Sequence, residues 1–241
     1  MEWRDQGLII GVRRHGETSA IVELFTPQRG RHLGLVRGGR SRRMQPLLQL
    51  GNSVDVHWYA RLDEHLGTFT LEITRSRAAL LMESAVGLHG IQWLSHLLRL
   101  SSEREPHSVL YDTALLIADH LHQPEICPAL MARFELGFLS ELGFGLSLDE
   151  CAVTGRNDEL NFVSPKTGRA VCDEAAAPYK DRLLPLPKFL CHAAMPTDKQ
   201  SLTDAFSLTG FFLDRNIFDP RGQAMPDSRA GFIAASVGEM A

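Results

Sequence analysis

The chain has 241 residues, of which 44% are hydrophobic and 22% are charged, and its formal net charge is −4. That is an ordinary composition for a globular protein with one large or two modest domains, and no run approaches the ~18 apolar residues of a membrane-spanning helix. Residues 1–5 lack the basic start and apolar run of a signal peptide, so we expect a cytoplasmic protein whose four cysteines are reduced.

The first part of the chain, from Gly7 to Glu72, has the pattern of short strands separated by turns. Apolar and β-branched residues alternate with polar ones, and Gly16 and Gly30 fall in turns that favour a positive φ. The expected strands cover residues 8–13, 19–25, 31–36, 54–59 and 68–73. Five short strands with such turn signals predict a small closed barrel.

After Arg77 the pattern becomes helical. Apolar residues recur at three- and four-residue steps from Leu80 to Leu98, which predicts one helix of about five turns. Further helices are expected over residues 106–121, 128–142 and 202–213, an irregular polar segment over 149–179, and a loosely ordered tail after about 214. The fold class is therefore α+β, with a domain boundary between residues 78 and 79.

Six arginines lie in a short stretch that carries no acidic residue and is interleaved with glycines. They are Arg29, Arg31, Arg37, Arg40, Arg42 and Arg43. Each guanidinium is always ionised and offers a bidentate donor pair that suits phosphate oxygens. Nucleic acid is the first candidate partner, and a solvated basic surface is the alternative.

Charge is distributed unevenly along the chain. Up to residue 79 there are twelve arginines and eight acidic residues, a balance of +4, whereas the remainder has a balance of −8. A basic N-terminal part on an acidic body indicates that one of the two parts has a charged partner.

Two segments of the basic part carry a resemblance to a known family. The run from Gly16 to Thr26, followed by Gly30 and by residues 37–43, resembles the opening of the RecO family of bacterial DNA repair proteins. In the helical body, residues 133–136 and the approach to Cys151 also resemble this family. The resemblance covers essentially residues 1–215.

The resemblance implies an OB-fold barrel at residues 1–78 and a helical domain at residues 79–241. Family members bind single- and double-stranded DNA, anneal complementary strands, and act with RecR to load RecA onto DNA coated by single-strand-binding protein. It also implies a nucleoid-associated protein without catalytic chemistry, whose helical domain holds the acidic tail of single-strand-binding protein. For the RecR contact the sequence indicates no residue.

The arginines are the candidates for phosphate contacts, and the alternation of side chains along a strand indicates which aromatic ring is exposed for a base. Trp58 shares a strand face with Val54 and Val56 and is expected in the core, whereas Tyr59 and His57 point the other way. We therefore expect phosphates to be bound by arginines and bases to stack on one exposed ring. The predicted set is Arg13, Arg14, Arg29, Arg31, Arg37, Arg40, Arg42, Arg43 and Tyr59.

One arginine of the helical part is a candidate for the tail of single-strand-binding protein. A terminal carboxylate needs a cation beside an apolar pocket, because its burial alone is costly. Arg133 lies beside Phe134 and a turn before Phe138, which makes it the candidate. The alternative is a solvated helix residue.

Many relatives carry a zinc site built from two Cys-x-x-Cys knuckles around a β-hairpin. Here the four matching positions are Cys151, Thr154, Cys172 and Ala175, in an insertion at about 149–179. Structural zinc takes four thiolate or imidazole ligands, and Thr and Ala supply neither. Cys127 and the pair Cys191-His192 are not excluded as ligands, but they lack knuckle spacing. We expect no metal or other cofactor, and packing within the hairpin in its place.

Enzyme and adaptor functions are the alternatives to DNA binding. His120 and His122 have i, i+2 spacing, which places them on different helix faces, and no P-loop or Gly-x-Ser-x-Gly motif occurs. No convergent acid, base and nucleophile set is recognisable, so an enzyme is not expected. The main alternative is a protein adaptor whose barrel binds an acidic protein, with DNA binding incidental.

Overall fold

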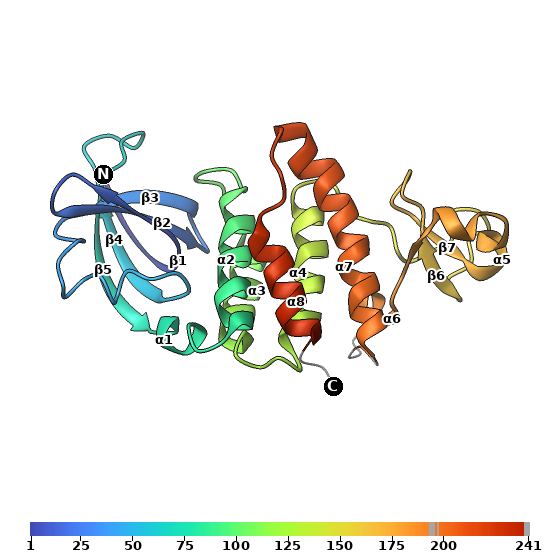
Figure 1. Ribbon diagram of the computed structural model, residues 1–241. Coiled ribbons are helices and arrows are strands. Elements are labelled where there is room, and N and C mark those ends of the chain that lie inside the picture. Colours follow the sequence, from blue (N-terminus) through green and yellow to red (C-terminus); the bar gives the residue numbers. More distant parts are fainter. Residues whose placement is uncertain (193–195, 197, 239–241) are drawn as a thin grey trace. The chain divides into compact units, whose positions relative to one another are not determined.

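A computed structural model describes residues 1–192, 196 and 198–238 (Figure 1). The chain divides into two compact units, Met1–His122 and Gln123–Ala241, which are described separately. The boundary predicted between residues 78 and 79 follows the last strand of the barrel but falls within the helical turn Ala78–Leu81, and it remains a prediction. Within the described ranges, no helix has both the length and the apolar character needed to cross a membrane.

The first unit begins with a closed five-stranded barrel, as expected for an OB fold. The strands are β1 (Glu2–His15), β2 (Ser19–Thr26), β3 (Gly30–Val36), β4 (Ser53–Tyr59) and β5 (Thr68–Arg75). Their order around the barrel is β1-β2-β3-β5-β4. All neighbours are antiparallel except β3 and β5, which pair in parallel through Leu35 and Thr68.

Alternating residues of the strands fill the interior of the barrel. Trp58 is fully buried there and Phe69 is 2% exposed, which confirms the core position predicted for Trp58. A Cβ at Gly34 would collide with the ring of Phe69, so the strand needs glycine at this point. The long connection between β3 and β4 contributes Leu48 and the half-buried Met44 to the same core.

Three helices complete the first unit and stand beside the barrel (Figure 1). They are α1 (Ala78–Leu81), α2 (Ala85–Arg99) and α3 (Ser108–His120). The prediction of a single helix from Leu80 to Leu98 is wrong, because α1 ends at Leu81 and a separate helix, α2, begins at Ala85. The hydroxyl of Ser84 accepts a hydrogen bond from the backbone N–H of Gly87 at 2.9 Å, and this N-cap starts a new helix.

Arg77 and Asn52 join the barrel to these helices. The Asn52 side chain accepts hydrogen bonds from the backbone N–H groups of Arg77 and Ala78, at 2.8 and 3.1 Å. The buried Arg77 guanidinium donates to the carbonyl of Gly51 at 2.9 Å and forms an ion pair with Asp119 of α3. The junction therefore satisfies buried polar groups of both the barrel and α3.

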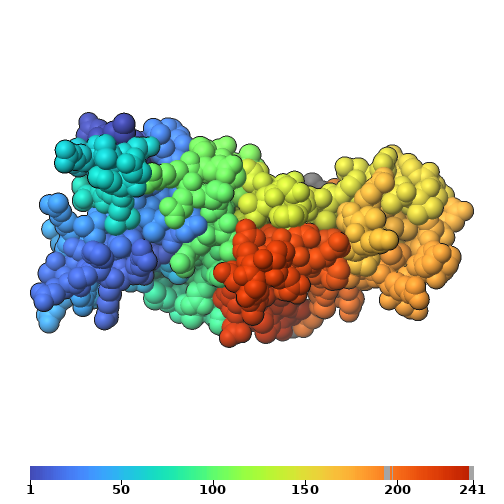
Figure 2. Space-filling view, turned by 90° about the horizontal axis from the view of Figure 1, so that it is seen from above, coloured from blue at the N-terminus to red at the C-terminus, as the bar shows by residue number. Residues whose placement is uncertain are grey.

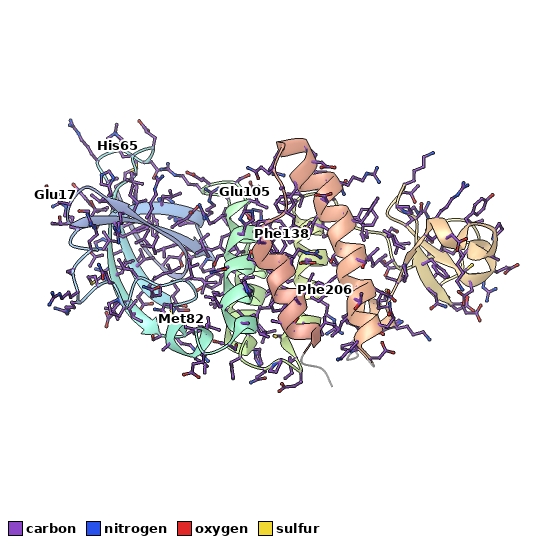
Figure 3. The ribbon with its side chains drawn as sticks, viewed as in Figure 1. Glu17, His65, Met82, Glu105, Phe138 and Phe206 are labelled. Atoms are coloured by element: carbon purple, nitrogen blue, oxygen red, sulfur yellow. The ribbon has the colours of Figure 1, made fainter. Side chains whose placement is uncertain are left out.

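The second unit has a core of three helices. They are α4 (Cys127–Glu141), α7 (Lys199–Leu213) and α8 (Asp227–Gly238). Short helical turns over Asp214–Phe218 and Asp219–Arg221 lead from α7 to α8. Figure 3 labels Phe138 of α4 and Phe206 of α7, both of which are buried.

The loosely ordered tail predicted after residue 214 is wrong, since most of this segment is helical. Arg229 of α8 forms a bidentate ion pair with the fully buried Glu135 of α4, with both distances 2.9 Å. It also donates to the carbonyl of Phe206 at 2.7 Å. Phe232, one turn further, is fully buried. These long-range contacts, and not local helix signals, hold the segment in place.

A small sheet forms within and beyond the segment expected to be irregular. Its strands are β6 (Leu160–Val163), β7 (Ala170–Cys172) and β8 (Leu184–Pro185), in the order β7-β6-β8. The helical turns α5 (Asp173–Ala176), η1 (Ala177–Arg182) and α6 (Lys188–Cys191) follow or flank these strands.

Candidate nucleic-acid interface

One end of the barrel gathers six of the eight predicted arginines. Strand register places Arg14 opposite Ala20, and Ala20 opposite Val36, so Arg37 follows at the same level. Arg40 fastens its loop to the turn between β1 and β2, since its backbone N–H donates to the carbonyl of Thr18 at 2.9 Å. We call this cluster the basic tip, and it consists of Arg13, Arg14, Arg37, Arg40, Arg42 and Arg43.

The basic tip carries six arginines and, on the turn between β1 and β2, one acidic residue, Glu17. Among the described residues, none of its six arginines takes part in a salt bridge, and all except the half-buried Arg40 are exposed. The side chain of Arg40 donates to the carbonyl of Gly16 at 2.6 Å. Glu17, labelled in Figure 3, is exposed on the turn between β1 and β2. Guanidinium groups so close together produce a positive potential that attracts polyanions.

The other two predicted arginines lie at the far end of the same strands. Thr26 pairs with Gly30 there, about 24 Å along β2 from the tip by the usual rise per residue. Arg31 is bound within the unit, by ion pairs to Glu23 and Glu103 and by a 3.1 Å hydrogen bond to Ser101. The structure therefore does not bring the six arginines of the sequence run onto one surface.

Arg29 at this far end is exposed and lies over the ring of Trp3, at 5.9 Å from the guanidinium carbon to the ring centroid. The pairing of Arg31 was detectable in the sequence. Once the hairpin register is known, Glu23 and Arg31 fall on the same face of neighbouring strands.

A hollow of about 610 Å³ lies beside the basic tip. Tyr59 lines it and is 59% exposed, in agreement with the outward direction that strand parity predicts. Arg37 of the tip lines the same hollow, so a cation and an aromatic ring share one concave surface. The complete lining is Val36, Arg37, Met44, His57, Tyr59, Thr68, Phe69, Thr70 and Leu71.

A second hollow, of about 930 Å³, continues from the first, since His57, Thr70 and Leu71 line both. It adds Arg4 and Arg43, which are basic, and the acidic residues Asp5, Asp55 and Glu72. The sequence reasoning assigned no role to Arg4. Strand register could have found it, because Arg4 pairs with His57 and shares the outward parity of Tyr59.

This arrangement suits binding rather than bond making or breaking. Guanidinium groups neutralise phosphates, and an exposed ring offers a platform on which a base stacks. His57, which lines both hollows, lies 3.3 Å from the carboxylate of Glu2. Such a constellation is chemically suited to the backbone and the base faces of a nucleic-acid strand, and not to the reading of sequence.

Arg133, the predicted partner-binding residue, is engaged within the second unit. Its Nε and Nη2 donate to the carbonyl of Phe189 at 3.0 and 2.8 Å, and Nη2 also donates to the carbonyl of His192 at 2.9 Å. The guanidinium lies 5.7 Å from the ring centroid of Phe189. Arg133 of α4 therefore holds α6 through hydrogen bonds. A docking carboxylate would have to share the N–H donors of Arg133 with the carbonyls of Phe189 and His192.

The knuckle positions lie together in the small sheet. The backbone N–H of Cys172 donates to the Cys151 sulfur at 3.3 Å, and the Thr154 hydroxyl lies 3.5 Å from the Cys172 sulfur. Burial opposes ionisation of the Cys151 thiol, but hydrogen bonds from Thr154 and from the backbone of Cys172, Thr154 and Val153 outweigh it and lower its pKa to about 6.

Two thiols do not match the four ligands of a closed zinc site. Over the described ranges, no group of three or more His, Cys, Asp or Glu residues is placed to hold a metal ion. Cys151 and Cys172 instead pack with Phe162, Val171 and Ala176 in a buried cluster. The packing hypothesis is consistent with this cluster, and stoichiometric zinc in the purified protein, measured by elemental analysis, would contradict it.

Two family models match the chain in sequence. The model described as "Recombination protein O N terminal" matches residues 1–77, which contain the barrel. The model described as "Recombination protein O C terminal" matches residues 88–224. Together they cover most of the chain, including the basic tip and the small sheet.

Curated relatives agree over nearly the full length. The "DNA repair protein RecO" of Brucella abortus (strain 2308) is 57% identical over 236 residues, which is 98% of this chain and 96% of the relative. The protein of the same name from Chelativorans sp. (strain BNC1) is 56% identical, over 98% and 95%. That of Methylorubrum extorquens is 52% identical, over 99% and 100%. The chain belongs to the RecO family of DNA repair proteins.

Proposed function

We propose that this protein is a recombination mediator that binds single- and double-stranded DNA and anneals complementary strands. The observation that carries the proposal is the basic tip, where six arginines gather without an acidic partner in the described part of the chain. Membership of a DNA repair family supports it. The protein acts by binding and exchange and performs no catalytic step.

Counterion release explains how the tip would bind DNA of any sequence. Each phosphate neutralised by an arginine releases condensed cations, so affinity falls steeply as salt rises. Annealing follows from the same chemistry. Two complementary strands repel each other through their phosphates, and a protein that neutralises part of that charge lowers the repulsion between them.

We further propose that the protein acts with RecR, at the nucleoid, to help load RecA onto DNA coated by single-strand-binding protein. In this proposal residues 1–78 form the DNA-binding domain and residues 79–241 the partner-binding domain. The charge division supports the assignment, because the basic part attracts a polyanion and the acidic part does not.

For the tail of single-strand-binding protein, the second unit offers an apolar hollow of about 530 Å³. Phe206, Phe211 and Ile233 supply apolar walls, and Arg229 lines the hollow although it is paired with Glu135. We propose that the tail docks on this unit, with Arg133 or Arg229 as the cation. A labelled tail peptide titrated against the Arg133→Ala variant would distinguish them. Weaker binding of the peptide would indicate Arg133 as the cation, and unchanged binding would indicate Arg229.

The DNA-binding proposal is tested by fluorescence anisotropy of a labelled oligo-dT across a range of salt. If the tip neutralises about five phosphates, the log–log slope is about −3.5. A variant with Arg37, Arg40, Arg42 and Arg43 changed to alanine should lose most of both affinity and slope. The same four positions changed to lysine provide the control, because charge is kept.

Equal and weak binding by the native protein and the alanine variant would overturn the proposal. The adaptor function would then be favoured, with the tip as a docking surface for an acidic protein. A quadruple lysine variant that binds as weakly as the alanine variant would instead indicate that bidentate geometry, and not charge, controls binding.

A further inference from the structure

The barrel face that OB folds ordinarily use for oligonucleotides is covered in this protein. That face is the outer surface of strands 2 and 3. Here Phe25 of β2 is fully buried and Ile21 is 7% exposed, although neither belongs to the cluster of residues that fills the barrel. Their side chains are therefore buried on the outside of the barrel, where α2 contacts β1 and α3 contacts β2. Figure 2 shows the green surface of these helices directly against the blue surface of the barrel.

Polar contacts seal the same face. Glu23 on the outer side of β2 is 6% exposed and forms an ion pair with Arg99 of α2 at 2.9 Å. The backbone N–H of Arg104 donates to the carbonyl of Arg31 at 2.8 Å. A Cβ at Gly30 would collide with the carbonyl oxygen of Glu105, which Figure 3 labels beside the barrel. These contacts close the outer face of β2 to a nucleic-acid strand, and the outward residues Arg31, Leu33 and Leu35 of β3 are half-buried beside it.

The outer face of β1, β4 and β5 is open by contrast. Register aligns outward residues of these three strands in rows, one of which is Glu2, Tyr59 and Thr68. The next row is Arg4, His57 and Thr70, and the third is Gln6, Asp55 and Glu72. Of these nine residues only His57 and Thr68 are half-buried, and the other seven are exposed.

We propose that single-stranded DNA crosses this β1-β4-β5 face, with an unpaired base on the ring of Tyr59 and its phosphate at Arg37. The proposal rests on the proposed DNA-binding function and adds where the strand runs. Arg37 and Tyr59 line one hollow, so a nucleotide that places its base on the ring has a guanidinium within the same concavity.

Charge is distributed unevenly along the β1-β4-β5 face. The basic tip lies next to the row of Tyr59, and Arg4 and His57 lie in the middle row. The first row contains one carboxylate, Glu2, which lies 3.3 Å from His57, whereas the third row presents two, Asp55 and Glu72, which repel phosphates more strongly. Successive rows are about 7 Å apart along the strands, so the attractive part of the face is short. The strand therefore enters from the tip and leaves before the acidic row.

The face also separates single from double strands. A base reaches Tyr59 only when it is unpaired and unstacked, whereas the exposed tip arginines meet phosphates of either form. Removal of the ring should consequently weaken binding to single strands alone. Removal of tip arginines should weaken both.

The test compares Tyr59→Ala, Tyr59→Phe and Arg99→Ala by anisotropy, each with oligo-dT and with a duplex of equal length. Tyr59→Ala should bind oligo-dT about 5- to 150-fold more weakly, the range of one stacked base, with duplex affinity unchanged. Tyr59→Phe should bind as the native protein does, because the ring is kept. Arg99→Ala removes a cation from the covered side and should change neither affinity.

Equal effects of Tyr59→Ala on both DNA forms, or a loss only in Arg99→Ala, would place the strand elsewhere and overturn the proposal. Absence of DNA binding by the native protein would overturn the DNA-binding function itself, which is a distinguishable result. As a second measurement, oligo-dT carrying 5-iodouracil should photocrosslink to the peptide that contains Tyr59. Crosslinks confined to β2 and β3 would also contradict the proposal.

Discussion

Six arginines of the barrel tip and two arginines of the second unit, Arg133 and Arg229, are chemically identical and structurally opposite. At the tip, six guanidinium groups have no acidic partner among the residues that the structure describes, and five of the six residues are exposed. In the second unit, Arg229 is buried against Glu135 and Arg133 is bound to two backbone carbonyls. The difference shows that some basic residues hold the fold together, whereas others are left open to a ligand.

Substitution of these arginines or of their partners should therefore lower stability in the second unit, and substitution of the tip arginines should weaken binding. The two kinds of effect are separable, because the tip arginines contribute little to packing. Four predictions, each with its own variant, test stability and binding, from the largest expected effect to the smallest.

Glu135→Ala should produce the largest loss of stability. It leaves the buried Arg229 without its carboxylate, and breaking a buried ion pair costs about 3–5 kcal/mol. Urea unfolding followed by circular dichroism measures the loss. Glu125→Ala, at an exposed position in the same unit, should change the free energy of unfolding by less than about 0.5 kcal/mol. Similar effects of the two substitutions would refute the structural role of the pair.

His32 should make the barrel sensitive to acid. Burial, aided by the positive charges of Arg104 and Arg29 and opposed by Asp63, lowers its pKa from 6.5 to about 4. The unfolded chain then binds the proton more readily than the folded protein does. The contribution of neutral His32 to the free energy of unfolding is therefore complete above pH 6.5 and is lost as pH falls towards 4. The loss is roughly 3 kcal/mol.

The measurement for His32 is the free energy of unfolding at several pH values between 7 and 4. His32→Phe keeps a ring beside Trp3 and Trp58 and removes the titrating group, so its stability should depend less on pH in this window. An unchanged pH dependence in the variant would show that another group is responsible.

Arg13→Ala combined with Arg14→Ala should weaken oligo-dT binding about 25-fold at 0.1 M salt. Two lost phosphate contacts reduce the log–log slope by about 1.4. Stability should hardly change, since both side chains are exposed at the end of β1. Arg31→Ala is the matched comparison at the far end, and it should destabilise the barrel while leaving DNA affinity intact. The opposite pattern would reverse the distinction drawn above.

Arg133→Ala should have the smallest effect, a loss of roughly 1–2 kcal/mol from the hydrogen bonds to Phe189 and His192. Thermal unfolding measures it. Arg133→Lys keeps the charge but not the planar donors, and should recover only part of the loss. A variant as stable as the native protein would mean that these hydrogen bonds exchange with water at no net cost.

Local signals predicted the barrel well. Strand parity placed Trp58 inside and Tyr59 outside, and the turn glycines Gly16 and Gly30 adopt the positive φ expected of them. These features depend on neighbouring residues alone. The break before Ser84 was missed because apolar spacing continues through it, although the backbone of Ser84 is extended and its side chain caps α2.

Long-range pairing limited the prediction of the site. The arginine run is continuous in sequence, but the length of β3 separates Arg31 from Arg37 and places them at opposite ends of the barrel. The helix after residue 226 depends on Glu135, which is 94 residues away from Arg229. The separation of Arg31 from Arg37 follows already from the strand predicted over residues 31–36, whereas the pairing of Glu135 with Arg229 is not readable before the topology is known.

The junction of Asn52 and Arg77 bears on how the barrel can be handled as a fragment. A fragment cut after residue 78 would strip Arg77 of Asp119 and would expose Phe25, which the helices cover. Such a piece is a poor candidate for autonomous expression, whereas one ending at His122 keeps every contact of the junction. Exchange of barrels between relatives would thus have to carry α1 to α3 along, as one transplantable module.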